Sequence, residues 1–326
     1  MKPFFIVGSP RTGTTLLRRI LTAHPEVAIP PESTFITEYL RATHVPLETR
    51  KTLFLADPGL EEWQVSFRSS DFASAETMAG VIRLAHERYA AQVGRSHWGQ
   101  KAARLVRHWQ LLRETFPDAV FVHPRRDPRA VVASLKRSKA HQLNALMGAR
   151  RWRDDTARGL AMVETLGERA LTYAYEDLVS DPEPVVRRLC DHLGLRFDPS
   201  MLETPATQIS LTASEQRAGH HVNVTRPINT SSVERWRKDL DEHEQAIVAE
   251  VAGEVARRAG YTLPDASPLS RRQVLELQLQ NLGVSVRKSI QSVREKPEIW
   301  RLAKRHLRLG SMGRVFSEAF GGRAPN

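Results

Sequence analysis

The sequence predicts an α/β protein: a three-layer sandwich on a central parallel sheet, with a P-loop-like nucleotide-binding core and a helical, basic C-terminal extension. Three observations support this. Short apolar runs of β type alternate with segments of helical periodicity, as in βαβ units. The first run, residues 4–8, passes through a glycine-bounded loop straight into a helical pattern. A second run, residues 119–123, leads to Asp127 and Pro128, which suit the N-cap and first position of a helix at 129–137.

The remaining elements follow the same alternation. Two further strands are expected, at residues 97–100 and 170–175. Helices are expected where apolar residues recur every three or four positions, at residues 14–23, 77–93, 105–116, 145–166, 182–192 and 233–259. Two stretches, 43–75 and 199–230, have little periodicity, and we interpret them as lids over a site.

The composition limits the class of protein. The chain has 326 residues and one cysteine, Cys190, so it cannot form an intramolecular disulfide, which fits a reducing compartment. No run approaches the ~18 apolar residues of a membrane span. No signal peptide precedes the first strand, so we expect a cytoplasmic location.

The net charge of +11 is unevenly distributed. Residues 265–326 contain 12 Lys and Arg against 5 Asp and Glu, a net of +7, which leaves +4 for residues 1–264. We therefore predict a main domain at 1–264 and a basic extension at 265–326. Because the excess charge lies mostly in the extension, we do not expect the core to bind nucleic acid.

The extension has an apolar helical stripe followed by a basic one. The first stripe is formed by Leu275, Leu279, Leu282, Val286, Ile290 and Val293. We expect it to pack on the chain's own domain, with a homodimer through these helices as the alternative. The second stripe comprises Arg301, Lys304, Arg305 and Arg308. It fits a basic face exposed to solvent, and weak contact with an anionic membrane surface is the open alternative.

The loop after the first strand has the G-x-x-x-x-G spacing of a P-loop, from Gly8 to Gly13. Backbone N–H groups of such a loop and the helix N-terminus behind it favour an anion. A nucleoside-triphosphate site would continue with Lys and then Ser or Thr. This chain continues with Thr14 and Thr15, and its cation, Arg11, lies inside the loop. We therefore expect the loop to hold a phosphate-like group differently from an ordinary ATPase.

A second phosphate contact is predicted after the strand at 119–123. Arg126 follows the end of that strand, and Ser134 lies eight residues later, about two helical turns away. A guanidinium fork and a hydroxyl can donate to the same phosphate. Taken singly, each of these residues also fits an exposed helix surface.

Together, the two segments resemble the sulfotransferase family that uses 3′-phosphoadenosine-5′-phosphosulfate (PAPS). They read GSPRTGTT at 8–15 and RDPRAVVAS at 126–134, and WGQK at 98–101, YAYEDL at 173–178 and RWRKDL at 235–240 follow the family's order. The resemblance covers roughly residues 4–260. It implies that the 5′-phosphosulfate is held by Arg11, Thr12, Gly13, Thr14 and Thr15, and the 3′-phosphate by Arg126 and Ser134. Further nucleotide-binding candidates are Tyr175, Arg235, Trp236 and Arg237.

The catalytic candidates are Arg11, Lys101 and Glu32. In-line sulfuryl transfer builds negative charge that cations stabilise, which suits Arg11 and Lys101. The acceptor hydroxyl also needs a base. In the family branch that acts on small phenols and steroids, the base is a His two residues after the Lys, where this chain has Ala103. The other branch, which includes tyrosylprotein sulfotransferases, uses a Glu soon after the first helix, and Glu32 matches it.

The resemblance therefore implies a PAPS-dependent sulfotransferase that releases 3′,5′-adenosine bisphosphate (PAP), needs no metal and acts on an acceptor hydroxyl. The acceptor is open among carbohydrate, lipid, peptide tyrosine and other small molecules. The histidines lack metal-ligand spacing.

Other interpretations stay open. A P-loop kinase would need Lys at position 14 and a metal-binding Asp near the strand end that carries Arg126, and a non-catalytic nucleotide-binding protein is a second rival. Glu32 is also placed to serve near the N-terminus of a helix at 33–42, and Lys101 to be a solvated strand end. Trp236 is expected to be a packing residue near the nucleotide.

Overall fold

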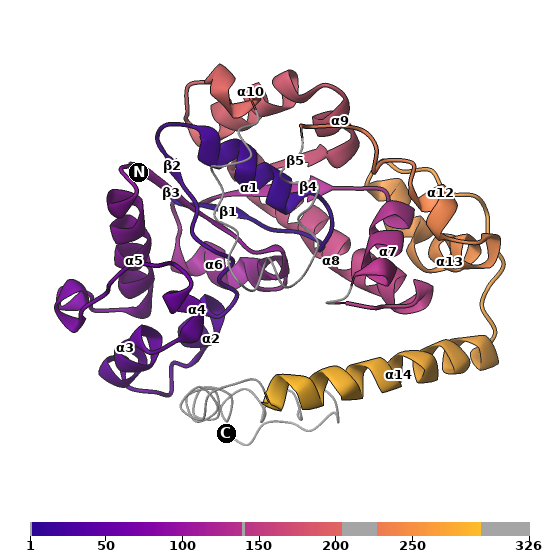
Figure 1. Ribbon diagram of the computed structural model, residues 1–326, viewed down its shortest axis with the longest axis horizontal. Helices are drawn as coiled ribbons and strands as arrows, with labels where there is room; N and C mark the ends of the chain where they lie inside the picture. Colours follow the sequence, from indigo (N-terminus) through magenta and orange to yellow (C-terminus); the bar gives the residue numbers. More distant parts are fainter. Residues whose placement is uncertain (1, 139–140, 204–226, 295–326) are drawn as a thin grey trace.

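Five parallel strands form one sheet at the centre of the protein (Figure 1). The computed structural model describes residues 2–138, 141–203 and 227–294. The strands are β1 (Phe4–Ile6), β2 (Val27–Ala28), β3 (His97–Lys101), β4 (Val120–Arg125) and β5 (Ala170–Ala174). They lie in the order β2-β3-β1-β4-β5, with every neighbouring pair parallel. The predicted α/β fold on a parallel sheet is confirmed.

Helices cover both faces of the sheet, as the alternation of buried residues along β1 requires. Phe4 and Ile6 are buried on one face with residues of α1 (Thr14–Ala23) and α10 (Pro182–Leu193). Phe5 is buried on the opposite face. The helices that cover that face are α5 (Met78–Gln92), α6 (Trp109–Thr115) and α8 (Ala145–Leu166) (Figure 1). The three layers follow directly from this pattern.

Several helices lie where the sequence predicts them. α1 and α8 have the expected bounds. The Asp127 carboxylate accepts from the backbone N–H of Arg129 at 2.7 Å and begins α7 (Pro128–Arg137). Gly194 ends α10 in the left-handed conformation that favours glycine.

Two predicted helices are wrong as single elements. Residues 105–116 divide into a 3₁₀ helix, η2 (Ala103–His108), and α6, because the chain leaves β3 through tight i→i+3 turns such as Leu105 N–H to Ala102 O at 3.0 Å. Residues 233–259 divide into α12 (Trp236–Asp239) and α13 (Glu242–Arg258), because Asp241 and Glu244 form a capping box that starts a new helix.

The stretch 43–75 is not a lid. It folds into α3 (Leu47–Leu55), α4 (Pro58–Glu61) and the 3₁₀ helix η1 (Ser69–Phe72), after α2 (Ile36–Arg41). Phe54, Trp63 and Phe72 are at most 3% exposed and belong to the core beneath the sheet. Burial of these aromatic side chains holds the stretch in place. Of the second expected lid, residues 204–226 lie outside the described part of the chain.

The remaining elements are short or peripheral. Tyr175 begins a helix, α9 (Tyr175–Ser180), rather than ending β5 as expected. Two 3₁₀ helices, η3 (Gly167–Arg169) and η4 (Pro199–Met201), connect elements. The last helix of the described residues, α14 (Arg271–Arg294), runs along one edge of the molecule (Figure 1). None of the helices in the described residues is long and apolar enough to cross a bilayer.

The apolar stripe of α14 does not pack as expected. Leu275, Leu279 and Leu282 are 56–58% exposed. Instead, the neighbouring face of α14 contacts the domain at Asn144, before α8. Asn144 Nδ2 donates to Leu277 O at 2.6 Å, and Asn281 Nδ2 donates to Asn144 Oδ1 at 3.1 Å. The side chains of Val286, Ile290 and Val293 and the basic stripe lie outside the described residues. The boundary at 264 stays a prediction.

Candidate active site

The loop after β1 passes between the ends of its two neighbouring strands. The N–H of Val7 donates to Val122 O beyond β1, and the N–H of Gly8 donates to Ala103 O, both at 3.0 Å. Arg11 and Gly13 adopt left-handed backbone conformations, with φ of 71° and 90°. For Arg11 this conformation is unusual, which is typical of loops that hold a ligand.

Gly13 has no space for a side chain. A Cβ atom there would lie 2.4 Å from the ring of Tyr175. α1 begins directly after Gly13, and no described side chain caps it. Its first turn also contains no Asp or Glu. The N–H groups and the positive end of the helix dipole therefore face the loop without a negative partner from the described residues, which suits an anion.

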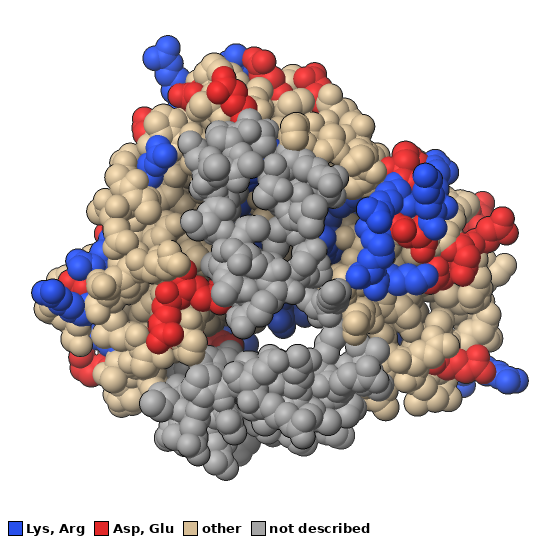
Figure 2. Space-filling view, in the orientation of Figure 1, with Lys and Arg blue, Asp and Glu red and all other residues tan. Residues whose placement is uncertain are grey.

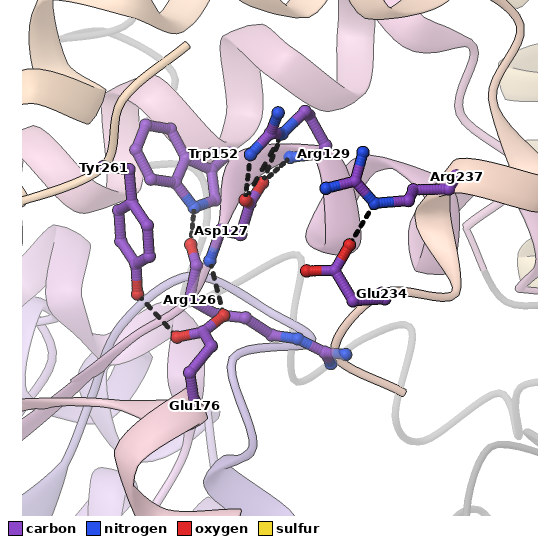
Figure 3. A network of polar contacts seen from close by, with 8 residues as sticks. All are labelled: Arg126, Asp127, Arg129, Trp152, Glu176, Glu234, Arg237 and Tyr261. Carbon is purple, nitrogen blue, oxygen red and sulfur yellow. Dashed lines mark hydrogen bonds and ion pairs between the residues drawn. The ribbon is translucent and has the colours of Figure 1, made fainter. Parts of the chain in front are cut away.

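Two hydrogen bonds hold the turn after β4, and a third holds Glu176, the partner of one of them (Figure 3). Trp152 Nε1 donates to Arg126 O at 2.9 Å. The N–H of Asp127 donates to Glu176 Oε1 at 3.0 Å, and the hydroxyl of Tyr261 donates to Glu176 Oε2 at 2.9 Å. Glu176 therefore ties this turn to α9 and to the end of α13, and this fixes where the Arg126 side chain starts.

The Arg126 side chain reaches the first loop. Its Nη1 donates to Arg11 O at 3.0 Å, and its Nη2 donates to Ser232 O at 2.6 Å. The guanidinium lies 4.2 Å from the centre of the Tyr175 ring, whose hydroxyl is 2.8 Å from Ser232 Oγ. Arg126 is 7% exposed, so the interpretation as an exposed surface residue is wrong.

Arg11 connects the loop to Ser134. Its Nε donates to Ser134 Oγ at 2.9 Å, and Ser134 is 8% exposed. Burial, and then the positive charges of Arg126 and Arg137, lower the pKa of Arg11 to about 10. Among the described residues, neither Arg11 nor Arg126 has a carboxylate within ion-pair distance. The cluster therefore carries an excess of positive charge, and an anion would stabilise it.

Lys101 and Glu32 form an ion pair at the end of β3. Lys101 Nζ lies 2.7 Å from Glu32 Oε2, with the lysine side chain 2% exposed and the glutamate side chain 36% exposed. Lys101 is therefore not a solvated strand end. Glu32 is not a helix cap either, because α2 begins at Ile36 with Phe35 in the N-cap position. A buried cation holds a carboxylate whose outer part is open to solvent.

The strand register brings these groups to one edge of the sheet. Ile6 pairs with Lys101 on one side and with Val122 on the other. The connections leaving β1 and β4 go to opposite sides, which makes their carboxyl ends a topological switch point, where ligands bind in open α/β sheets.

The late motif lies at the margin of this site. Trp236 is 3% exposed, with the guanidinium of Arg129 4.0 Å and that of Arg237 4.5 Å from its ring centre. Arg235 and Arg237 have side chains 54% and 64% exposed and pair with Asp239 and Glu234. Figure 2 shows Lys and Arg side chains gathered beside acidic ones over the place of α12. Trp236 packs as expected, and the predicted nucleotide contacts of this motif stay predictions.

Two residues near the cluster are missing from the sequence prediction. Arg137 contributes charge next to Arg11, and it follows Ser134 by three positions on α7, a spacing that suggests one face of a helix. Ser232 accepts from Arg126 through its backbone, and nothing in its sequence context indicates this. Within residues 2–138, 141–203 and 227–294, no group of three His, Cys, Asp or Glu side chains is placed to hold a metal.

Comparison with known proteins decides the family. A model of the sulfotransferase family matches residues 3–199, more than half of the chain. The chain belongs to this family. The sulfotransferase is 29% identical over 283 residues to protein-tyrosine sulfotransferase A of Caenorhabditis elegans, covering 82% of this chain and 69% of the relative. It is also 26% identical to protein-tyrosine sulfotransferase 1 of Danio rerio, over 82% and 74% of the two chains.

Solved structures agree with this assignment. The sulfotransferase domain of the Synechococcus PCC 7002 olefin synthase is 25% identical, with a TM-score of 0.58 over 81% of this chain and 96% of that one. The sulfotransferase domain from the curacin pathway, at 20% identity and a TM-score of 0.56, shares the fold. The predicted family, fold and enzymatic sulfuryl transfer are confirmed.

Proposed function

We propose that this sulfotransferase takes its sulfuryl group from PAPS and transfers it to an acceptor hydroxyl, with Glu32 as the base. The contact of Glu32 with Lys101 supports this proposal, because it places a carboxylate beside a buried cation at the same sheet edge as the arginine cluster. In the reaction, the acceptor oxygen forms a bond to sulfur and the bond from sulfur to the 5′-phosphate oxygen breaks. The hydroxyl proton goes to Glu32, and PAP leaves.

The residues at the switch point fit the donor's two phosphate ends. Arg126 Nε is buried and has no partner among the described residues, although a guanidinium normally uses all its N–H groups. With Ser134, it would hold the 3′-phosphate. Arg11 and residues 12–15, at the N-terminus of α1, would hold the 5′-phosphosulfate.

Lys101 has two roles in this proposal. Its ammonium would stabilise the negative charge that develops on the transferred oxygens and the leaving phosphate. Its contact with Glu32 also holds that carboxylate in place before the acceptor arrives. No metal is part of the proposal, because positively charged side chains of the protein would bind the phosphates.

The proposed acceptor is a hydroxyl compound, and peptide tyrosine is the first acceptor to test. Several relatives are named as protein-tyrosine sulfotransferases. The test also includes an oligosaccharide, because the family resemblance leaves carbohydrate hydroxyls open as acceptors. Cytoplasmic location and a homodimer through α14 belong to the proposal as well.

Two measurements test this function. PAP should raise the melting temperature more than ATP with Mg²⁺ does, because a bound ligand stabilises the folded state by mass action. Glu32→Gln should keep PAP affinity and lower turnover of labelled PAPS with a tyrosine peptide or an oligosaccharide by about 10²–10⁴-fold, as expected for a positioned base. Glu48→Gln is the matched control, because the Glu48 side chain is 81% exposed. A loss below tenfold in Glu32→Gln would remove Glu32 from the role of base.

A further inference from the structure

The segment that carries Glu32 rests on buried polar contacts. Pro31 and Ser33 are buried on either side of the exposed Glu32. Ser33 Oγ donates to Pro31 O at 2.8 Å and accepts from Trp63 Nε1 at 2.9 Å. Buried hydrogen bonds therefore hold the backbone on both sides of Glu32, while its carboxylate extends toward Lys101.

Gln100 connects this segment to the strand that carries the lysine. Its side chain is 0% exposed. Gln100 Nε2 donates to Pro31 O at 3.3 Å and to Lys101 O at 3.2 Å. One amide group thus contacts the backbone just before Glu32 and the backbone of Lys101, the two residues whose side chains form the ion pair.

The orientation of the Gln100 amide follows from its partners. Two carbonyl oxygens face one end of the amide, so that end is the nitrogen and the oxygen faces His86. His86 Nε2 lies 2.8 Å from Gln100 Oε1, which has no other donor in the part of the chain that the structure describes. A neutral His86 ring carries one N–H, which can donate to Gln100 Oε1 or to Ile82 O, the oxygen 2.8 Å from Nδ1, but not to both.

His86 is held in turn by its surroundings. It is 0% exposed, its Nδ1 lies 2.8 Å from Ile82 O, and its ring centre lies 4.7 Å and 4.4 Å from those of Trp63 and Trp98. Burial lowers the pKa of His86 to about 4, so the ring is neutral near pH 7. His86 thus packs against the Gln100 amide with its Nε2 at hydrogen-bond distance, and it is too deeply buried to exchange protons with an acceptor.

We propose that Gln100, supported by His86, is a positioning residue of the transfer reaction that sets the geometry of the Glu32 carboxylate and the Lys101 ammonium. The inference rests on the proposed function, since it assumes that these two groups act on the acceptor and the sulfuryl group. Its physical basis is that displacement of a reacting group by 1 Å can cost about 10²-fold in rate. Gln100 is fully buried, and on β3 its side chain points to the opposite face of the strand from that of the next residue, Lys101.

The test replaces the amide without changing the length of the side chain. Gln100→Met should lower kcat by about 10–100-fold and leave KM for PAPS and the affinity for PAP within twofold. His86→Gln offers a donor for Gln100 Oε1, so its kcat should exceed that of His86→Leu. Thr172→Val is the matched control for stability, because it removes only the hydrogen bond from Thr172 Oγ1 to His123 O at 2.9 Å. Its kcat should be unchanged.

A double variant separates this inference from the proposed base. In a Glu32→Gln background, Gln100→Met should cause a smaller loss than in the unmodified chain, because the part that acts through Glu32 is already gone and only the part through Lys101 remains. If Glu32→Gln loses turnover and Gln100→Met loses less than threefold, the positioning role is wrong and the base stands. If Gln100→Met loses turnover equally with and without Glu32, it acts by another route and the inference is also wrong.

A crystal structure of the Gln100→Met chain provides a readout that needs no acceptor. The distance from Lys101 Nζ to Glu32 Oε2, 2.7 Å in the unmodified chain, should increase beyond ion-pair range, while the loop after β1 stays unchanged. An unchanged ion pair would overturn the inference whatever the acceptor is.

Discussion

Replacement of Gly13 by alanine should disturb nucleotide binding through the ring of Tyr175. The new Cβ would lie 2.4 Å from Tyr175 Cδ2, and the backbone φ of 90° would strain any L side chain. The ring cannot move freely, because its hydroxyl contacts Ser232 Oγ at 2.8 Å and its face contacts Arg126 at 4.2 Å. A shift of the ring therefore displaces the guanidinium proposed to hold the 3′-phosphate.

The magnitude divides into two parts. A left-handed alanine costs about 1–2 kcal/mol. An overpacked contact adds about 1–3 kcal/mol, which gives about 2–5 kcal/mol for Gly13→Ala. Gly94→Ala isolates the first part, because Gly94 has a φ of 69° and an added Cβ meets no described atom within 4 Å.

Guanidinium unfolding and calorimetry with PAP measure the two effects. Gly13→Ala should lose more stability than Gly94→Ala, and only Gly13→Ala should weaken PAP binding, by at least tenfold or about 1.4 kcal/mol. Equal losses of stability in the two variants, or unchanged PAP affinity in Gly13→Ala, would refute the reasoning that Tyr175 transmits the clash.

Three further predictions concern other parts of the chain. Calorimetry should show that Arg126→Ala weakens PAP binding more than Ser134→Ala does. The loss is about 1.5–3 kcal/mol for each charged hydrogen bond of Arg126 and about 1–2 kcal/mol for the Ser134 hydroxyl. An unchanged affinity in Arg126→Ala would contradict this. Cys190 is buried and its pKa is raised to about 11, mainly by burial, so a thiol reagent at pH 8 should modify it only as fast as the protein unfolds, and rapid reaction of the folded chain would contradict the burial. The exposed leucines of α14 are Leu275, Leu279 and Leu282. If α14 pairs with a second copy, replacing these leucines by glutamate should halve the mass measured by light scattering. A monomeric mass for the unmodified chain would contradict the prediction.

The sequence predicts elements well where local signals and tertiary packing agree. α1 and α8 are periodic over their whole length, and both lie within their predicted bounds. The division of α12 from α13 depends on the capping box at Asp241, a signal present in the sequence but outweighed by the apolar periodicity around it. The stretch 43–75 shows no periodicity because its aromatic residues, such as Phe54 and Trp63, are buried by contacts with distant segments.

The candidate site is predictable in its members but not in its contacts. Arg11, Arg126 and Ser134 come together as their motifs suggest, although it is Arg11 that donates to Ser134 in this structure. That contact depends on the left-handed backbone of Arg11, which residue preferences do not favour. The support of Glu32 by Gln100 joins segments 69 positions apart and becomes visible only in the folded chain.

The order of the strands places the two sides of the candidate site on different parts of the chain. In the described contacts, the side chains around Glu32 come from one continuous length of chain, residues 31–101, whereas Arg126, Ser134 and Tyr175 come from β4 onward. The loop after β1 contacts both sides, through Gly8 N–H to Ala103 O and through Arg11 Nε to Ser134 Oγ. A recombination that exchanges residues 29–96 between relatives would therefore replace the segment that carries Glu32, keep Lys101 and the arginine cluster of the recipient, and leave all five strands in place. Such an exchange would change the surroundings of the proposed base without altering the strands that carry the rest of the site.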